Sequence, residues 1–215
     1  MFRPIQSHGQ PVTLVGAGEG SVQLLKIALA RAPLLIAVDG GAALAQAAGA
    51  EMAAVVGDFD SIGDLNLPEV LLLHTPDQNL TDFQKALTVT DAPCILGVGF
   101  LGGRIDHQLA AFSALLQDRR PIILLTETEV AFLAPERLTL DLPEESAISF
   151  YPLEETQFDS AGVAYPLSRS QMQPGGLIST SNRVKDGPVE VQATGGVLVT
   201  LPLAGLDAVL HALWQ

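Results

Sequence analysis

The chain has 215 residues, of which 48% are hydrophobic and 16% are charged, so it can bury a sizeable core and is not intrinsically disordered. Its formal net charge of −13 argues against a nucleic-acid partner, because proteins that bind nucleic acids usually present a basic face. The single cysteine, Cys94, excludes an internal disulfide and is expected in the core. Polar side chains interrupt the amino-terminal stretch, and no apolar run approaches the ~18 residues of a membrane span. We therefore expect a soluble, cytoplasmic protein with no membrane partner.

The first half of the chain alternates short apolar runs with stretches of helical spacing. The apolar runs, each a predicted strand, cover residues 12–15, 34–38, 55–56, 70–73, 94–98 and 122–125. Strands that alternate with helices at short spacing predict a parallel sheet covered on both faces. In such sheets ligands bind beyond the carboxyl ends of the strands, so the residues that follow each run are the candidates for a site.

A glycine-rich segment, GAGEG at residues 16–20, follows the first run, and Ser21 can cap the helix after it. Glycines between a strand and a helix suit a backbone that approaches a phosphate. The third glycine comes one residue earlier than in the dinucleotide-binding fingerprint. A plain tight turn explains the segment about as well as phosphate binding does.

Two carboxylates follow the strand at residues 55–56, in the sequence VVGDFDSI. Asp58 and Asp60 are two residues apart, so in extended backbone they point the same way and can hold one hard cation such as Mg²⁺. The alternative is that these acids only form a turn and bond to their own backbone. Asp39 and Gly40 follow the second predicted strand and belong to the same edge of the sheet.

The segment DQNLTDFQKAL at residues 77–87 predicts a helix that starts near Asn79. Helical spacing puts its apolar side chains on one face, toward the sheet, and Asp82 and Lys85 on the other. With Gln78 just upstream, this polar face can look into a cleft. The alternative is that Asp82 completes a capping box with Asn79 and needs no ligand.

Another glycine-rich turn, GFLGGRIDH at residues 99–107, leads into a further predicted helix. Arg104 stands at the helix entrance and can grip a phosphate with both arms of its guanidinium group. His107 either takes part in proton transfer or makes a structural hydrogen bond. The spacing predicts that Ile105 and Leu109 lie on the buried face of this helix.

The residue pattern changes after about residue 134, where prolines divide the chain into short segments that alternate in polarity or are rich in β-branched residues. Such segments, at residues 147–151, 189–193 and 197–201, predict a small antiparallel β-sandwich. Residues 206–214 have helical spacing and predict a short docked helix. We therefore expect an α/β domain over residues 1–134 and a sandwich domain over residues 135–215.

Acidic side chains at several strand or helix ends, one lysine and one arginine should converge at one edge of the sheet. Hard carboxylates in that number suggest Mg²⁺, and Mg²⁺ with Lys and Arg suggests phosphoryl transfer, which depends on positioning and charge neutralisation. The Walker A motif and the protein-kinase signature set are absent from the sequence. The residues alone predict a Mg²⁺-dependent nucleotide enzyme.

The ordered set of these motifs resembles the thiamine pyrophosphokinase (thiamine diphosphokinase) family over roughly residues 12 to 201. The resemblance rests on DGG at 39–41, GDFDS at 57–61, Gln78 with TDF at 81–83 and Lys85, GGRIDH at 102–107, STSN at 179–182 and GG at 195–196. Each piece is short, but their order and intervals match the family. The tail past Leu201 has no counterpart that we can match.

The resemblance implies an α/β catalytic domain followed by a β-sandwich, assembled as a homodimer. It implies transfer of the terminal pyrophosphoryl group of ATP to the hydroxyl of thiamine, which gives thiamine diphosphate and AMP. The Mg²⁺ ligands would be Asp58, Asp60 and Asp82. The nucleotide and phosphate contacts would be Asp39, Gly40, Gln78, Thr81, Lys85, Arg104, Asp106 and His107. The catalytic group would comprise the three metal ligands with Lys85, Arg104 and Asp106.

The thiamine contacts implied by the resemblance are Tyr165, Ser179, Ser181 and Asn182, in a pocket shared across the dimer. Tyr165 stands where many family members have a tryptophan, and a tyrosine can still offer its ring face to a cationic ligand.

Two other classes of function fit the same residues. A Mg²⁺-dependent phosphohydrolase would use water in place of the alcohol acceptor, and the acid cluster alone permits it. A non-catalytic nucleotide or thiamine sensor would not need the full set of acids together with Lys85 and Arg104. Thiamine-dependent release of AMP distinguishes the kinase from both.

Overall fold

The computed structural model describes residues 5–58, 70–75, 77 and 79–214. Asp60 and Gln78 lie outside these residues. The chain divides into two compact units, Met1–Glu127 and Thr128–Gln215. The division falls earlier than the expected boundary at residue 134, because β9 (Glu129–Leu133) pairs antiparallel with β16 (Val197–Pro202) of the second unit. Among the described residues, no helix is long and apolar enough to cross a membrane.

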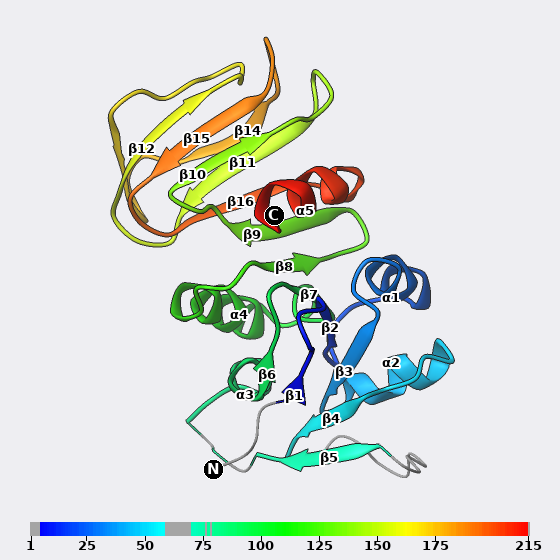
Figure 1. The fold of residues 1–215 in the computed structure, drawn as a ribbon. Helices are drawn as coiled ribbons and strands as arrows, with labels where there is room; N and C mark the ends of the chain where they lie inside the picture. Colours follow the sequence, from blue (N-terminus) through cyan, green and yellow to red (C-terminus); the bar gives the residue numbers. More distant parts are fainter. Residues whose placement is uncertain (1–4, 59–69, 76, 78, 215) are drawn as a thin grey trace. The chain divides into compact units, whose positions relative to one another are not determined.

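The sheet of the first unit contains parallel strands, each paired in register with its neighbour (Figure 1). Their order is β8 (Ile122–Leu125), β7 (Ile95–Val98), β2 (Val12–Val15), β3 (Leu34–Val38), β4 (Ala54–Gly57) and β5 (Leu71–His74). β8, β7, β2 and β4 are buried along their whole length, as their almost entirely apolar sequences predict. A separate short parallel pair joins β1 (Ile5–Gln6) to β6 (Thr90–Asp91).

Helices cover both faces of this sheet, with α1 and α2 on one face and α3 and α4 on the other (Figure 1). Their bounds are α1 (Val22–Leu29), α2 (Gly41–Ala47), α3 (Asp82–Val89) and α4 (Ile105–Gln117). Ser21 caps α1 by accepting a hydrogen bond from the backbone N–H of Leu24, as the sequence predicts. The expectation of a mixed α/β fold is confirmed.

The order of strands in the sheet changes direction at β2. β3 lies on one side of β2, and β7, which follows much later in the sequence, lies on the other. The helices that follow these two strands, α1 after β2 and α4 after β7, cover opposite faces of the sheet, which opens a crevice at the carboxyl ends of β2 and β7. This point is where an α/β sheet of this kind binds its ligand.

Helix α3 begins later than the sequence predicts. Asp77 accepts hydrogen bonds from the backbone and side-chain nitrogens of Asn79, which holds a turn before the helix. Thr81 is the N-cap, and its hydroxyl and the Gln84 side chain form the capping box. The alternative in which Asp82 completes a capping box with Asn79 is therefore wrong, and Asp82 is the first residue of the helix.

The buried face of α4 also differs from the prediction. Ile105 is 73% exposed and Leu109 is 61% exposed, whereas Ala111, Ala114 and Leu115 are buried. The helix turns its small residues toward its neighbours, because α3 lies against α4 and a small side chain lets two helices approach closely. Apolar spacing identified the helix, but packing against α3 decided which side faces inward.

The second unit consists of antiparallel strands in two groups. One group has the order β14 (Ser179–Arg183), β11 (Ala147–Pro152), β16, β9, and the other has the order β10 (Arg137–Leu140), β15 (Val189–Ala193), β12 (Thr156–Ala161), β13 (Ser170–Met172). Phe150 of β11 and Phe158 of β12 are fully buried with ring centroids 5.1 Å apart, so their rings join the two groups in one core. A turn of 3₁₀ helix, η1 (Leu203–Gly205), leads into α5 (Leu206–Leu213).

Cys94 directly precedes β7 and is fully buried, as expected. Burial raises the pKa of its thiol to about 11, against a smaller lowering by a backbone hydrogen bond at Ile95. The thiol is therefore protonated at neutral pH and acts as a small apolar side chain.

Candidate functional site in the first unit

A cavity of about 770 Å³ opens at the carboxyl ends of β2 and β7. The glycine loops after these strands form much of its wall, and the starts of α3 and α4 and the end of β3 also line it. Predicted site residues that line it are Asp39, Thr81, Asp82, Arg104 and His107. The volume is in the range of cavities that bind cofactors and small ligands.

The backbones of the two glycine loops are in direct contact, and a side chain at Gly16, Gly18 or Gly99 would prevent this approach. Gly16 donates from its N–H to the carbonyl of Val98 at 2.8 Å, and Gly18 donates to the carbonyl of Gly99 at 2.9 Å. A Cβ atom at Gly99 would lie 2.4 Å from the carbonyl oxygen of Gly16, and the φ of Gly99 is +77°. The glycines therefore serve close approach and a left-handed turn, and both loops leave their backbones open to the cavity.

Asp39 brings a buried carboxylate to this cavity. It follows β3, is only 8% exposed and holds a left-handed φ of 46°, which is uncommon for a residue other than glycine. Its Oδ1 atom is buried without a hydrogen-bond partner among the described residues. A buried unpaired acceptor is costly, so a donor or cation in the cavity would stabilise it. Asp39 is thus placed to respond to a bound ligand.

Lys85 lies between two of the predicted metal ligands. Its Nζ atom is 2.8 Å from Oδ1 of Asp82 and 4.0 Å from Oδ2 of Asp58. The Lys85 residue is 4% exposed, so its side chain does not face solvent. It is buried because the carboxylate partners neutralise its charge while its aliphatic stem packs inward.

Arg104 and Asp106 form a two-point ion pair at the entrance of α4. Nε of Arg104 donates to Oδ1 of Asp106 at 3.1 Å, and Nη2 donates to Oδ2 at 2.6 Å. The hydrogen bond from Arg104 is the main reason that the pKa of Asp106 lies below its usual value, and Asp106 in turn raises the pKa of Arg104. Asp106 also accepts from the backbone N–H of His107 at 3.0 Å. Both members of the pair are exposed, so the guanidinium group can exchange partners at little cost.

Two residues of this cavity were not singled out from the sequence. Oε1 of Glu19 accepts a hydrogen bond from the backbone N–H of Gly103 at 3.0 Å, and this contact ties the two glycine loops together. Phe100 stacks against Phe83 of α3 with ring centroids 4.3 Å apart, which gives the cavity an apolar wall. The acid inside the first glycine segment was the only sequence signal for Glu19, and nothing local marked Phe100.

The predicted thiamine contacts all belong to the second unit. Ser179, Ser181 and Asn182 lie on β14, and Tyr165 lies in the connection from β12 to β13. Tyr165 is 63% exposed, whereas Asn182 is 3% exposed and bonds to the backbone of Tyr165. The structure therefore brings Asn182 and Tyr165 together, with Ser179 and Ser181 beside them on the same strand.

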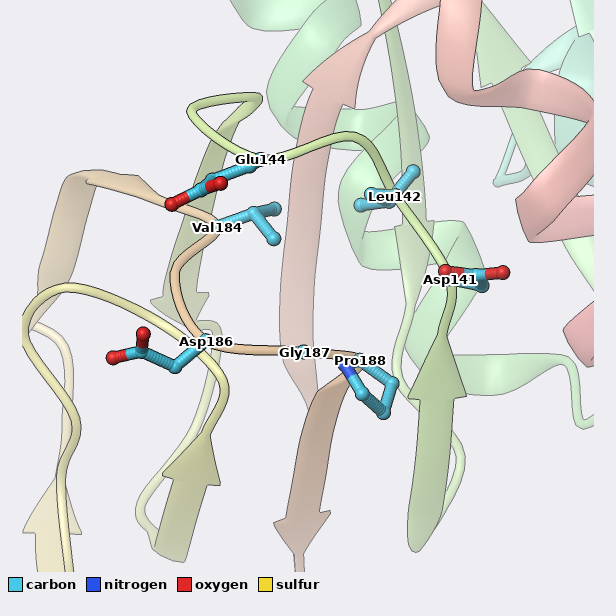
Figure 2. A pocket seen from close by; sticks show the side chains of 7 residues that line it. All are labelled: Asp141, Leu142, Glu144, Val184, Asp186, Gly187 and Pro188. Carbon is cyan, nitrogen blue, oxygen red and sulfur yellow. The ribbon is translucent and has the colours of Figure 1, made fainter.

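A smaller cavity of about 310 Å³ in the second unit contains none of the predicted site residues. Its acids are Asp141, Glu144 and Asp186, but the carboxylate of Asp141 points away from the other two (Figure 2). No cluster of three or more metal-ligating side chains occurs among the residues that the structure describes.

The fold and the first cavity together define a class of protein. A parallel α/β sheet with glycine loops at its switch point, a buried carboxylate and a Lys–Asp cluster is an architecture for binding phosphorylated ligands.

Comparisons with known proteins identify the family within this class. The family model described as "Thiamin pyrophosphokinase, catalytic domain" matches residues 25–125, and the one described as "Thiamin pyrophosphokinase, vitamin B1 binding domain" matches residues 136–198. The chain is 28% identical over 168 residues to Thiamin pyrophosphokinase 1 of Caenorhabditis elegans, an alignment that covers 69% of each protein. It is also 28% identical to Thiamine pyrophosphokinase 1 of Arabidopsis thaliana, over 69% of this chain and 64% of that protein.

Solved structures agree on the fold. Thiamin pyrophosphokinase from Geobacillus thermodenitrificans superposes with a TM-score of 0.74 at 23% identity, over 90% of this chain and 97% of that one. Thiamin pyrophosphokinase from Candida albicans superposes with a TM-score of 0.75 at 15% identity, over 94% of this chain and 92% of that one. The chain belongs to the thiamin pyrophosphokinase family, so the family predicted from the sequence and the prediction of an enzyme are confirmed.

Proposed function

We propose that this protein transfers the terminal pyrophosphoryl group of ATP to the hydroxyl of thiamine, forming thiamine diphosphate and AMP. The observation that carries this proposal is the cavity at the β2–β7 switch point, most of whose lining, from Val38 to Ala111, lies within residues 25–125, the part of the chain that matches the catalytic domain of the family. We assign ATP to the first unit and thiamine to the second unit, the proposed β-sandwich. We further propose a cytoplasmic homodimer with the thiamine pocket shared between subunits.

The reaction balances without a further co-reactant. The thiamine oxygen forms a bond to the β-phosphorus of ATP, and the bond from that phosphorus to the oxygen bridging the α-phosphate breaks. AMP leaves with the electron pair of the broken bond, and the hydroxyl proton is released. Phosphoryl transfer of this kind depends on orientation and on neutralising the phosphate charge.

The chain supplies that neutralisation at several points of the cavity. The backbone of the two glycine loops faces the space where phosphates would lie, and the guanidinium group of Arg104 is exposed at its edge. Lys85 is a buried cation paired with Asp82, which lines the cavity. We propose that Lys85 and Arg104 contact the phosphates, and that Thr81, Asp106, Asp39, Gly40, Gln78 and His107 complete the nucleotide site.

The acids also fit Mg²⁺. Asp58 and Asp82 both lie within 4.0 Å of the Lys85 ammonium, so one cation already contacts both carboxylates. Carboxylate oxygens are the hard ligands that Mg²⁺ prefers. We propose that these two residues, with Asp60, hold Mg²⁺, which when bound neutralises phosphate charge during transfer.

The decisive experiment incubates the protein with ATP and Mg²⁺, with and without thiamine, and quantifies AMP, inorganic phosphate and thiamine diphosphate. We expect AMP and thiamine diphosphate in equal amounts and only when thiamine is present. Release of inorganic phosphate without thiamine would establish the phosphohydrolase instead. Binding of ATP or thiamine with no turnover would establish a sensor.

A further inference from the structure

Strand β14 carries a bulge beside Tyr165. In its pairing with β11, Ile148 lies opposite Asn182 and Phe150 lies opposite Ser179, with a shift of register between them. Thr180 and Ser181 of β14 therefore stand opposite the single residue Ser149. A β-bulge of this kind bends the strand and changes the direction of its side chains.

The backbone of the bulge is held in an uncommon conformation. Ser181 has a left-handed φ of 56°, and its N–H donates to the hydroxyl of Ser149 at 3.0 Å. Thr180 and Ser181 are both exposed, and Asn182 directly after them is buried. The bulge thus turns two hydroxyl side chains outward and brings the Asn182 amide into the interior.

The Asn182 amide is fully engaged there. Its Oδ1 accepts hydrogen bonds from the backbone N–H groups of Tyr165 at 3.1 Å and of Arg183 at 2.9 Å. Its Nδ2 donates to the carbonyl of Tyr165 at 2.9 Å and to the Ser179 hydroxyl at 3.3 Å. An amide side chain has two donor hydrogens and one acceptor oxygen with two lone pairs, so these four bonds use its capacity. No atom of the Asn182 amide is left for a ligand in this arrangement.

Two of these bonds hold the backbone of Tyr165, one at its N–H and one at its carbonyl. The preceding residues are also anchored, because Val163 forms a β-bridge with Val184 and the N–H of Ala164 donates to the carbonyl of Arg183 at 2.9 Å. Tyr165 nevertheless remains 63% exposed. A fixed backbone below an exposed aromatic side chain pre-orders the ring without the entropy loss of ordering a mobile loop on binding.

We propose that Asn182 is a positioning residue, which holds Tyr165 so that its ring presents a face to a flat, cationic heteroaromatic ligand. This inference rests on the proposed function, in which that ligand is thiamine, and it replaces the expected direct contact of Asn182 with thiamine. The attraction between a cation and an aromatic face supplies the binding energy, and Asn182 supplies the orientation.

The test measures thiamine and ATP kinetics for Asn182→Ala, Tyr165→Ala and the double variant. A lost or misplaced ring face should raise the thiamine KM about 3- to 30-fold in each single variant, with kcat and the ATP KM within about 2-fold of wild type. Because Asn182 acts through Tyr165, the double variant should match Tyr165→Ala within about 2-fold. Titration calorimetry with thiamine alone should show the same pattern in Kd.

Ser160→Ala is the matched control, because it also removes a buried side-chain bond to the same connection. The hydroxyl of Ser160 accepts from the N–H of Leu167 at 3.0 Å, and Ser160 is 7% exposed. This variant should lower the melting temperature while leaving the thiamine KM unchanged. If Asn182→Ala does not fold, Asn182→Asp takes its place in the cycle, since it keeps the accepted bonds and loses the donated ones.

Other outcomes overturn the inference in distinguishable ways. If the increase in thiamine KM of the double variant equals the product of the increases in the two single variants, Asn182 contacts the ligand directly. A lower melting temperature with an unchanged thiamine KM would show a role in stability only. If wild-type protein forms no thiamine diphosphate, the proposed function fails, independently of the comparison among variants.

Discussion

At the scale of single residues, the Lys85 ammonium balances the negative charge of two carboxylates in the candidate site. A buried ammonium needs a partner, and Asp82 and Asp58 supply one close and one more distant carboxylate. The same carboxylates are the proposed Mg²⁺ ligands. Lys85 therefore keeps two like charges together, and under the proposed function its ammonium would contact phosphates if Mg²⁺ bound between the two carboxylates.

Replacing Lys85 with Met tests this role. Without the ammonium, Asp58 and Asp82 repel each other, so we expect the free energy of unfolding to fall by about 1–2 kcal/mol, discounted because Asp82 is 40% exposed. Millimolar Mg²⁺ should raise the melting temperature of Lys85→Met more than that of wild type. Lys26→Met in α1, away from any proposed site, is the control. Equal Mg²⁺ responses in variant and wild type would argue against a shared cation position.

Asp82 tests whether the start of α3 serves capping or chemistry. Thr81 and Gln84 already provide the capping box, so Asp82→Asn should cost only ~0.3–1 kcal/mol of helix-dipole stabilisation. The amide oxygen of the variant can still accept a hydrogen bond from Lys85, and Asp58 keeps a carboxylate 4.0 Å from the ammonium. We expect a small shift in melting temperature and at least a ~100-fold loss of thiamine diphosphate formation. Asp207→Asn removes an acid from the first turn of α5 and should affect stability alone. A large melting shift with activity retained would favour capping.

At the scale of elements, the carboxyl end of α3 is held by a residue that follows α4. The Arg120 guanidinium donates to the carbonyls of Leu87, at 2.8 Å, and of Thr90, and it pairs with Asp118. A helix ends with unsatisfied carbonyls, and a cation there also favours the helix dipole. Arg120 thus fixes the helix whose opposite end carries Asp82.

Lowering the pH should weaken the ion pair between Arg120 and Asp118, which supports the carboxyl end of α3. Burial raises the pKa of Asp118, but hydrogen bonds from the Arg120 side chain and backbone and its positive charge outweigh burial and lower the pKa below the usual value. A lowered pKa gives stability that is present above the unfolded-state value of about 3.9 and is lost as pH falls through the lower folded-state value. We expect wild type to be more stable than Asp118→Asn at pH 7, and the two to converge below about pH 4.

Melting temperatures of wild type and Asp118→Asn, measured from pH 7 to pH 3, test whether the stability difference is lost as the pH falls. Asp106→Asn is a useful control, because Asp106 also pairs with an arginine but its side chain is exposed, so losing this pair should change the free energy of unfolding little. A constant difference between Asp118→Asn and wild type from pH 7 to pH 3 would contradict the argument.

At the scale of the whole molecule, local patterns in the sequence located most of the elements. Unbroken apolar runs marked the buried strands of the first unit, because a strand covered on both faces has no polar side. Short alternating pieces likewise marked β11, β15 and β16 in the second unit. The candidate residues after the strands were predictable for a related reason, since parallel strands place all their carboxyl ends at one edge.

Contacts between distant residues decided what local patterns could not. The order of the sheet placed the loops after β2 and β7 side by side, and so made one cavity from two glycine segments. The side of α4 that faces inward depended on α3, which left Ile105 and Leu109 exposed. The sequence by itself determined the alternation of strands and helices and the residue types at the site, because these follow from backbone periodicity and side-chain chemistry. Tertiary structure alone decided that Lys85 is buried between carboxylates and that Asn182 holds Tyr165, because burial and hydrogen-bond partners depend on residues far away in the chain.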